Sequence, residues 1–75
     1  MAQKKKTILN VNGHQVEAYG KMGKFQNIYV LYEDRYGNVD EWVRCDGFSS
    51  WEVVENWLTR FEIKNDITVI EVAGV

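Results

Sequence analysis

The sequence predicts an α+β domain in the order ββββαβ: a four-stranded antiparallel meander, one α-helix across one face, and a C-terminal fifth strand. Three observations predict it. The first half holds strand-like segments with alternating apolar residues, Asn-Gly separates the first two of them, and residues 48–66 show helical periodicity. The chain has 75 residues, so we expect a single small domain over residues 1–75, with residues 1–5 disordered.

The first two predicted strands, residues 7–11 and 14–19, flank Asn12 and Gly13. Asn-Gly is typical of a two-residue hairpin turn, because both turn positions need positive φ. The turn pairs Val11 with His14, and the register directs one apolar set toward the core: Leu9, Val11, Val16 and Ala18. The opposite face then receives Ile8, Asn10, Gln15, Glu17 and Tyr19.

After a flexible link at residues 20–24, residues 25–34 and 39–46 form a second predicted hairpin, whose turn type the sequence leaves undecided. The apolar pattern favours one inward set: Ile28, Val30, Val43 and Cys45. The outward set is then Tyr29, Leu31, Trp42 and Arg44. A slip of one residue would exchange the two sets.

The predicted helix begins at a capping box, with Ser49 as N-cap and Glu52 three residues later. Its apolar stripe comprises Trp51, Val54, Trp57, Leu58 and Phe61. The opposite, solvent-facing side comprises Glu52, Glu55, Asn56, Thr59 and Glu62. We expect Asn65 to end the helix as a left-handed cap.

Residues 67–73 form the last predicted strand and are apolar on both faces. This strand could pair antiparallel with the first strand or parallel beside the fourth. Antiparallel pairs outnumber parallel pairs, so the first arrangement is favoured.

Composition bounds the function more than it identifies it. One Cys excludes an internal disulfide and fits a reducing compartment, and no apolar run is long enough to span a membrane, so we expect a cytoplasmic protein. Residues 1–24 hold five Lys and one Glu, whereas residues 25–75 hold the other ten acidic residues. The acidic body favours protein partners, basic ones in particular, over a phosphate backbone.

A helix on one side would leave the other face of the sheet open, with aromatic and aliphatic residues rimmed by charges. Such a patch is typical of a protein interface, and the second hairpin adds an acidic cluster. The predicted partner-binding residues are Tyr19, Tyr29, Leu31, Trp42, Arg44, Glu33, Asp34, Asp40 and Glu41. They predict a non-catalytic protein-binding module, an inhibitor or an adaptor that occupies a partner's surface.

The alternative function is a single-stranded nucleic-acid binder that stacks bases on Tyr19, Tyr29 and Trp42. Catalysis has little support, since His14 is interpreted as a solvated hairpin residue and Cys45 as a small buried one. We therefore expect no catalytic residue, metal or cofactor. A second copy of the chain could close the sheet edge or the open apolar face, giving a homodimer.

The segments 25–32, 51–61 and 67–72 together show a strand, a single helix and a terminal strand in a short, acidic chain. In length, acidity and element order the chain resembles the small accessory proteins that phages encode against host factors, such as antitoxins, anti-restriction proteins and anti-CRISPR proteins. The resemblance implies a non-enzymatic inhibitor that works by occupying a surface. It transfers no functional residue, because no motif carries it.

Overall fold

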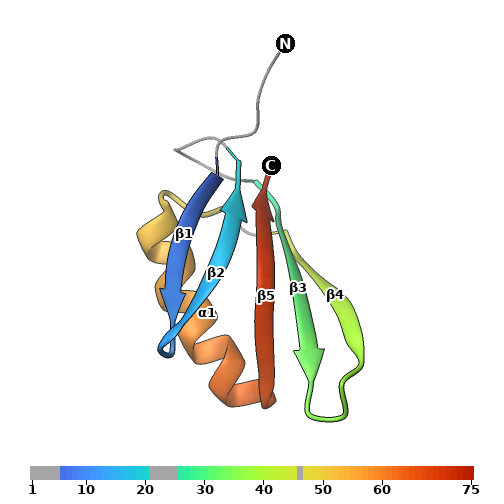
Figure 1. Ribbon diagram of the computed structural model, residues 1–75. Coiled ribbons are helices and arrows are strands. Elements are labelled where there is room, and N and C mark those ends of the chain that lie inside the picture. The colour runs from blue at the N-terminus through green and yellow to red at the C-terminus, as the bar shows by residue number, and fades with distance from the viewer. Residues whose placement is uncertain (1–5, 21–25, 46) are drawn as a thin grey trace.

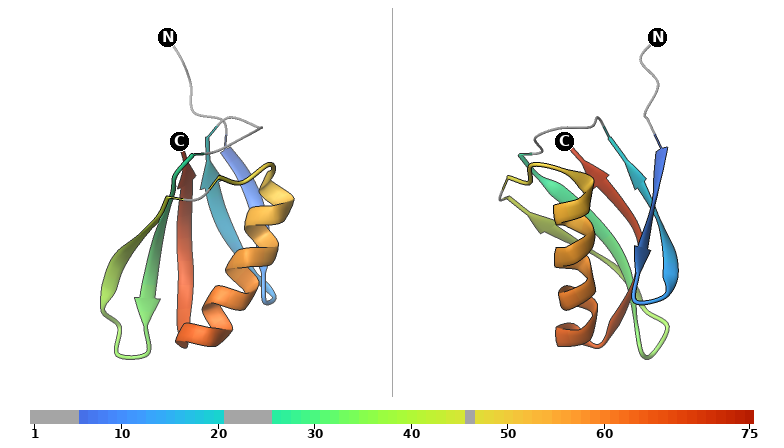
Figure 2. Two further views of the ribbon diagram at one scale, coloured as in Figure 1. Left: turned by 180° about the vertical axis from the view of Figure 1, so that it is seen from behind. Right: turned by 90° about the vertical axis from the view of Figure 1, so that its left-hand side faces the viewer.

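The computed structural model describes residues 6–20, 26–45 and 47–75; the expectations for residues 1–5 and for the link at 21–24 lie outside them. It contains one five-stranded sheet with one helix across one face, which confirms the α+β class (Figures 1 and 2). The elements are β1 (Lys6–Val11), β2 (His14–Tyr19), β3 (Ile28–Asp34), β4 (Val39–Arg44), α1 (Trp51–Asn65) and β5 (Ile67–Gly74).

The β1–β2 hairpin confirms its predicted register, with Val11 opposite His14 and each earlier pair as expected. Asn12 and Gly13 have φ of 50° and 87°, the positive values that a two-residue hairpin turn requires. The predicted inward residues of both strands are buried. Turn chemistry and apolar alternation agree here, and together they determine the hairpin.

Helix α1 begins one residue later than the capping box predicts. Ser50 is the N-cap, and its Oγ accepts a hydrogen bond from the N–H of Val53 at 3.3 Å. A capping box centred on Ser49 and Glu52 is therefore wrong, although a Ser does cap the helix as expected. At the other end, the left-handed cap is Asp66, with φ of 54°. The predicted cap, Asn65, is instead the last residue of the helix, so that prediction is wrong.

Strand β5 lies inside the sheet, whose order is β1-β2-β5-β3-β4. It runs parallel to β2 and antiparallel to β3, so both predicted partners, the first strand and the fourth, are wrong. The first four strands consequently form two separate hairpins and no continuous meander (Figure 1). The sheet is mixed.

The connection from β4 through α1 to β5 explains this order. The chain reverses at Asp66 directly after the helix, so β5 must run in the same direction as β4. The crossover is right-handed, as expected for parallel strands, and passes over β3 (Figures 1 and 2). An interior position suits β5 because its apolar residues pair and pack on both sides.

The β3–β4 turn shifts β4 by one residue relative to the prediction. Asp34 N–H donates to Asn38 O at 2.9 Å, Gly37 N–H donates to Asp34 O at 3.1 Å, and Gly37 has φ of 85°. This is a three-residue loop closed by a left-handed Gly, and it pairs Val30 with Trp42. The predicted orientation is therefore confirmed in β3 and wrong in β4.

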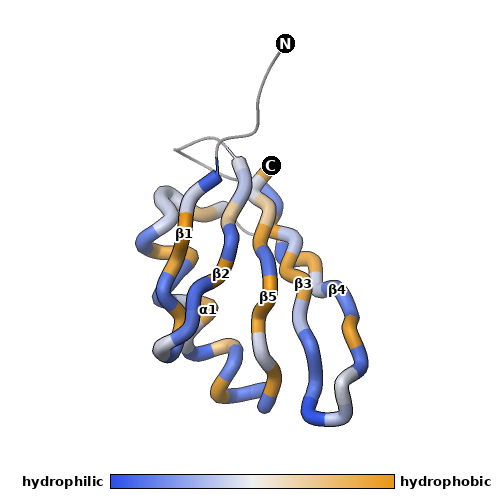
Figure 3. The backbone as a smooth tube through the Cα atoms, in the orientation of Figure 1, coloured by the Kyte–Doolittle hydropathy of each residue, from blue (hydrophilic) through white to orange (hydrophobic). Residues whose placement is uncertain are grey.

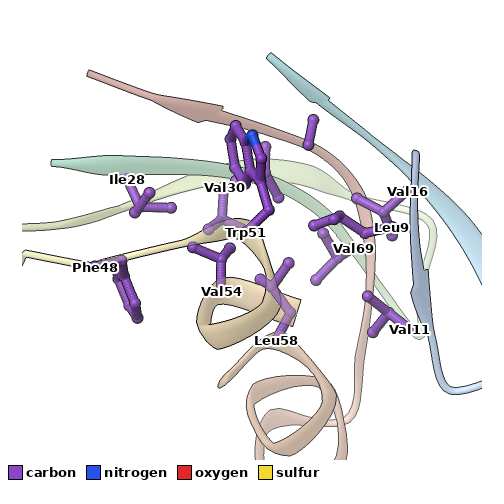
Figure 4. Packing of buried hydrophobic residues seen from close by; sticks show 12 residues of the cluster. Leu9, Val11, Val16, Ile28, Val30, Phe48, Trp51, Val54, Leu58 and Val69 are labelled. Carbon is purple, nitrogen blue, oxygen red and sulfur yellow. The ribbon is translucent and has the colours of Figure 1, made fainter. Parts of the chain in front are cut away.

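The core lies between α1 and the β1, β2, β5 and β3 strands, and Figure 4 shows ten of its labelled side chains converging there. Val54 and Leu58 of the helix have no exposed surface. In β5, Ile70 is an extra residue between two paired positions, a bulge that lets Val69 and Val72 both face the core. Figure 3 shows apolar residues recurring along β5, whereas β3 becomes hydrophilic toward its end.

Candidate functional site

The face of the sheet opposite α1, called here the open face, is covered by no element in the described part of the chain (Figure 2). The strand registers place two rows of side chains across all five strands of this face. The mostly apolar row is Lys6, Tyr19, Ala73, Tyr29 and Val43. The mostly acidic row is Ile8, Glu17, Glu71, Leu31 and Glu41.

Both rows are accessible to a partner. Ile8 exposes 48% of its surface, Tyr29 36% and Val43 45%, which is high for side chains of this size. Single exposed apolar residues are ordinary, but a contiguous row across five strands forms a patch of the kind that marks an interaction site.

Glu17 is neutralised by its neighbours on the open face. Its Oε1 lies 2.9 Å from Lys6 Nζ, and the Tyr19 hydroxyl donates to its Oε2 at 2.8 Å. The hydrogen bond from Lys6 lowers the pKa of Glu17 from its ordinary value. The same carboxylate raises the pKa of both Lys6 and Tyr19, mainly by accepting their hydrogen bonds.

Three other carboxylates on this face lack such compensation: Glu33, Glu41 and Glu71. Within residues 6–20, 26–45 and 47–75, none of them forms an ion pair. Glu71 also lies beside Glu17 in the parallel β2–β5 pair, so two acidic residues are neighbours on adjacent strands. Like charges in this arrangement repel, and a cationic partner would relieve that repulsion.

The nine predicted partner-binding residues do not share one face. Trp42 lies on the helix side of the sheet, where its ring centroid is 5.6 Å from that of Phe61. Arg44 lies on the same side, with its guanidinium carbon 4.8 Å from the Trp57 ring centroid. Their predicted outward placement is wrong because of the β4 register. The open face keeps Tyr19, Tyr29, Leu31, Glu33 and Glu41.

The two Asp residues among the predicted partner-binding residues stabilise the backbone of the second hairpin. They do not form a common acidic patch with the Glu residues of the open face. Asp40 is on the helix side, and its Oδ1 accepts from Glu41 N–H at 2.8 Å. Asp34 Oδ1 accepts from the N–H groups of Asn38 and Tyr36, each at 2.9 Å. These bonds, first of all the one from Asn38, lower the pKa of Asp34.

A groove of about 820 Å³ runs between α1 and the edge strand; we call it the α1–β4 groove. Aromatic and basic side chains dominate its lining: Trp42, Trp57, Phe61, Arg44, Arg60 and Lys64. Trp57 and Phe61 stack with ring centroids 4.7 Å apart. Among the described residues, no carboxylate lines the groove, and Arg60 and Lys64 form no ion pair. The groove is thus opposite in charge to the open face.

Glu62 is buried, at 6% exposure, although the sequence placed it on the solvent side of the helix. Its Oε2 accepts from Val69 N–H at 2.7 Å and lies 2.6 Å from His14 Nε2, and its Oε1 accepts from Asn12 Nδ2 at 3.0 Å. The carboxylate therefore joins the first turn, the helix and β5. Its spacing of four residues from Leu58 was the signal that it lies on the buried stripe.

The structure contradicts two predictions about chemically reactive residues, those for His14 and Cys45. His14 was expected to be a solvated hairpin residue, but its ring bonds the buried Glu62. Cys45 was expected to be buried and is exposed, because the β4 register turns it to the open side.

Comparison of the chain with protein-family models, with curated proteins and with solved structures found no match. The described residues contain no group of three or more His, Cys, Asp or Glu side chains that could hold a metal ion. None of their helices combines the length and the apolar character needed to cross a membrane. Function must therefore be argued from the two surfaces alone.

Proposed function

We propose that this protein is a protein-binding module whose open face occupies a basic, partly apolar surface of a larger protein. One observation carries the proposal. Apolar side chains form a row across β2, β5, β3 and β4, on the same face as three carboxylates that have no described ion-pair partner. A partner that presents Lys or Arg around an apolar patch would match both rows.

The charge distribution favours a different protein over a second copy on this face. Among the described residues the open face has four Glu and one Lys, and that Lys is already bound to Glu17. Two such faces pressed together would bring uncompensated carboxylates against each other. A basic partner removes that repulsion and gains the apolar contact.

Occupation of a surface is enough for the role of an inhibitor when that surface is the partner's own binding site. It is enough for an adaptor when a second surface of this protein binds elsewhere. The alternative, base stacking on Tyr19, Tyr29 and Trp42, requires three rings on one face, and Trp42 lies on the other side of the sheet. The geometry therefore favours protein binding.

The test compares two variants with the same change in net charge. Glu41→Lys with Glu71→Lys reverses two carboxylates of the open face. The control set reaches the same change on the outer helix surface through Glu52→Lys, Asn56→Lys and Ile63→Lys, all at exposed positions. Proteins captured from the native host would be identified, purified and titrated calorimetrically against wild type and both variants at low and high salt.

We expect the open-face variant to bind its partner at least about tenfold more weakly, with the control variant unchanged. Wild-type affinity should fall as salt rises, because the contacts are between charges. Equal binding by wild type and the open-face variant would refute the proposal, as would loss of binding in the control variant alone.

A further inference from the structure

Strand β4 is an edge strand, and no described strand pairs with its outer side. All of its residues except Arg44 are exposed, and Val39, Trp42 and Val43 expose 55%, 48% and 45% of their surfaces. An exposed edge with large apolar side chains is a site at which another strand can pair. The proposed function uses the Glu41 and Val43 side chains of this strand on the open face but not its outer backbone groups.

The hydrogen-bonding pattern shows which backbone groups β4 offers. Asp34 N–H bonds Asn38 O across the hairpin, and bonded pairs in an antiparallel ladder alternate. The backbone groups of Val39, Glu41 and Val43 therefore point away from β3. The Glu41 N–H agrees with this direction, since it donates to the Asp40 side chain and not to a strand.

The side chains of β4 are complementary to the same strand running in the opposite direction. We infer that two copies of this chain associate through β4, antiparallel, with Trp42 opposite the partner's Trp42 and Asp40 opposite the partner's Arg44. A two-fold axis perpendicular to the sheet generates both Asp–Arg pairs at once. The resulting sheet is continuous across ten strands, with both helices on one face.

This register is favoured over its neighbours by charge. A shift of the pairing by two residues, so that Glu41 lies opposite its own copy, places two carboxylates side by side. The opposite shift places Trp42 against Arg44 and leaves Asp40 without a basic counterpart. Opposite charges that face each other across strands stabilise pairing, and like charges oppose it, so the register centred on Trp42 is selected.

The pairing also gives hydrogen-bond partners to the backbone groups of β4 that point away from β3. In this register Glu41 and Val43 of one copy face Val43 and Glu41 of the other, and these are the residues whose N–H and C=O groups are directed outward. Glu41 N–H exchanges its bond to Asp40 for the partner's carbonyl, which releases the Asp40 carboxylate toward Arg44 of the second copy. The partner's Trp42 then lies beside the α1–β4 groove, whose lining already includes Trp42.

The exposed Cys45 provides a direct test of the register. Continued by one residue, the pairing places Cys45 opposite Val39 of the other copy, at a Cα separation of roughly 5.5 Å that a disulfide can bridge. The two native Cys45 residues lie about 20 Å apart, so wild type should not cross-link. We expect Val39→Cys to give a covalent dimer on mild oxidation, seen on a non-reducing gel.

Two controls distinguish this from random collision. Ile63→Cys introduces an equally accessible thiol on the outer helix surface, and it should cross-link much more slowly. Val39→Cys combined with Cys45→Ser should not cross-link, because the introduced thiols are as far apart as the native ones. Cross-linking of Val39→Cys no faster than Ile63→Cys overturns the inference.

A charge exchange tests the Asp–Arg pairs without any covalent bond. Asp40→Arg and Arg44→Asp should each weaken dimerisation at least about threefold in sedimentation velocity, because each places like charges opposite one another. The double variant should restore the wild-type dissociation constant to within about twofold, since each pair is re-formed with its charges exchanged. Within one strand these two residues are too far apart to compensate each other, so restoration requires a second copy.

A wild-type protein that stays monomeric at all concentrations, or a double variant that is weaker than both single variants, refutes the inference. An acidic peptide bound in the α1–β4 groove without dimerisation would refute it as well. The charge exchange alters only Asp40 and Arg44, which lie on the helix side of the sheet, and leaves the side chains of the open face unchanged. The partner of the open face could therefore bind normally in a variant that no longer dimerises, which separates this inference from the proposed function.

Discussion

The two edges of the sheet are finished in different ways. At the β1 edge the outward N–H of Asn10 donates to Glu55 Oε2 of the helix at 2.8 Å, and Asn12 Nδ2 donates to Thr59 O at 3.1 Å. At the β4 edge the outward N–H of Glu41 is bonded only within its own strand, by Asp40. Helix α1 packs mainly over β1 and β5, and toward β4 it leaves the α1–β4 groove.

This difference indicates that one half of the fold determines stability, whereas the other half is available for binding. The half made of β1, β2, β5 and α1 contains most of the buried aliphatic residues and the Glu62 cluster, and β3 adds Ile28 and Val30 to the same core. In the other half, every residue of β4 except Arg44 is exposed, and β4 borders the basic, aromatic groove. Segments with few buried contacts open at lower free-energy cost, and binding surfaces are drawn from them. The half made of β1, β2, β5 and α1, called here the closed half, should therefore determine the free energy of unfolding. The half made of β3 and β4, called the open half, should tolerate change.

The largest expected effect is in the closed half. Leu58 has no exposed surface and lies in the core over β1 and β5. Leu58→Ala should lower the free energy of unfolding by about 2–5 kcal/mol, because it removes buried methyl groups and leaves a cavity. Urea denaturation followed by Trp fluorescence measures this. A loss below about 1 kcal/mol would contradict the assignment of the core to this half.

Glu62→Ala should cost about 2–4 kcal/mol in the same measurement, since it leaves the donors of Asn12, His14 and Val69 without their acceptor. Glu62→Gln keeps the volume and one acceptor oxygen, so its cost should be smaller. The exposed helix residue in Glu52→Ala serves as the control and should change stability by no more than about 0.5 kcal/mol. Equal effects of the Glu62 and Glu52 substitutions would show that the cluster does not stabilise the fold.

Local sequence signals predicted the β1–β2 hairpin of the closed half well. Asn12 and Gly13 determine a turn length, and the turn length determines the register of every pair in the first hairpin. In the second hairpin the equivalent information was carried by Gly37, whose positive φ closes a three-residue loop. Without that turn length the apolar pattern alone placed β4 one residue out, because Trp42 and Val43 are both apolar.

The order of the strands could not be obtained from neighbouring residues. The position of β5 depends on the direction in which α1 returns the chain and on the handedness of the crossover, which are properties of the whole fold. The same applies to the site. The sequence identified Tyr29 and Leu31 on the open face through alternation along one strand, whereas the α1–β4 groove exists only because Trp42 and Phe61 come together from separate elements.

A smaller effect is expected at the boundary with the open half. Trp42 is the largest side chain of β4, but it remains 48% exposed and touches the helix chiefly through Phe61. Trp42→Ala should lower the free energy of unfolding by about 1–2 kcal/mol, less than Leu58→Ala, because only part of its surface leaves water on folding. A greater loss than that of Leu58→Ala would show that β4 belongs to the core rather than to its boundary.

The smallest effect is a pH dependence confined to the second hairpin. The N–H groups of Asn38 and Tyr36 bond the Asp34 carboxylate and lower its pKa, so its contribution to stability is present above the unfolded-state pKa and is lost as pH falls through the folded-state pKa. Asp34→Asn retains an acceptor oxygen without the charge. Wild type should therefore exceed this variant in stability above about pH 5, and the difference should disappear as pH falls through the lowered folded-state pKa of Asp34. Denaturation curves measured in parallel across this range give the difference, in which the titration of the other carboxylates cancels.

NMR spectra should localise the change to amides of β3 and β4. A stability difference that does not vary with pH would contradict the role of Asp34. Shifts that extend equally into the β1–β2 hairpin would contradict the independence of the two halves.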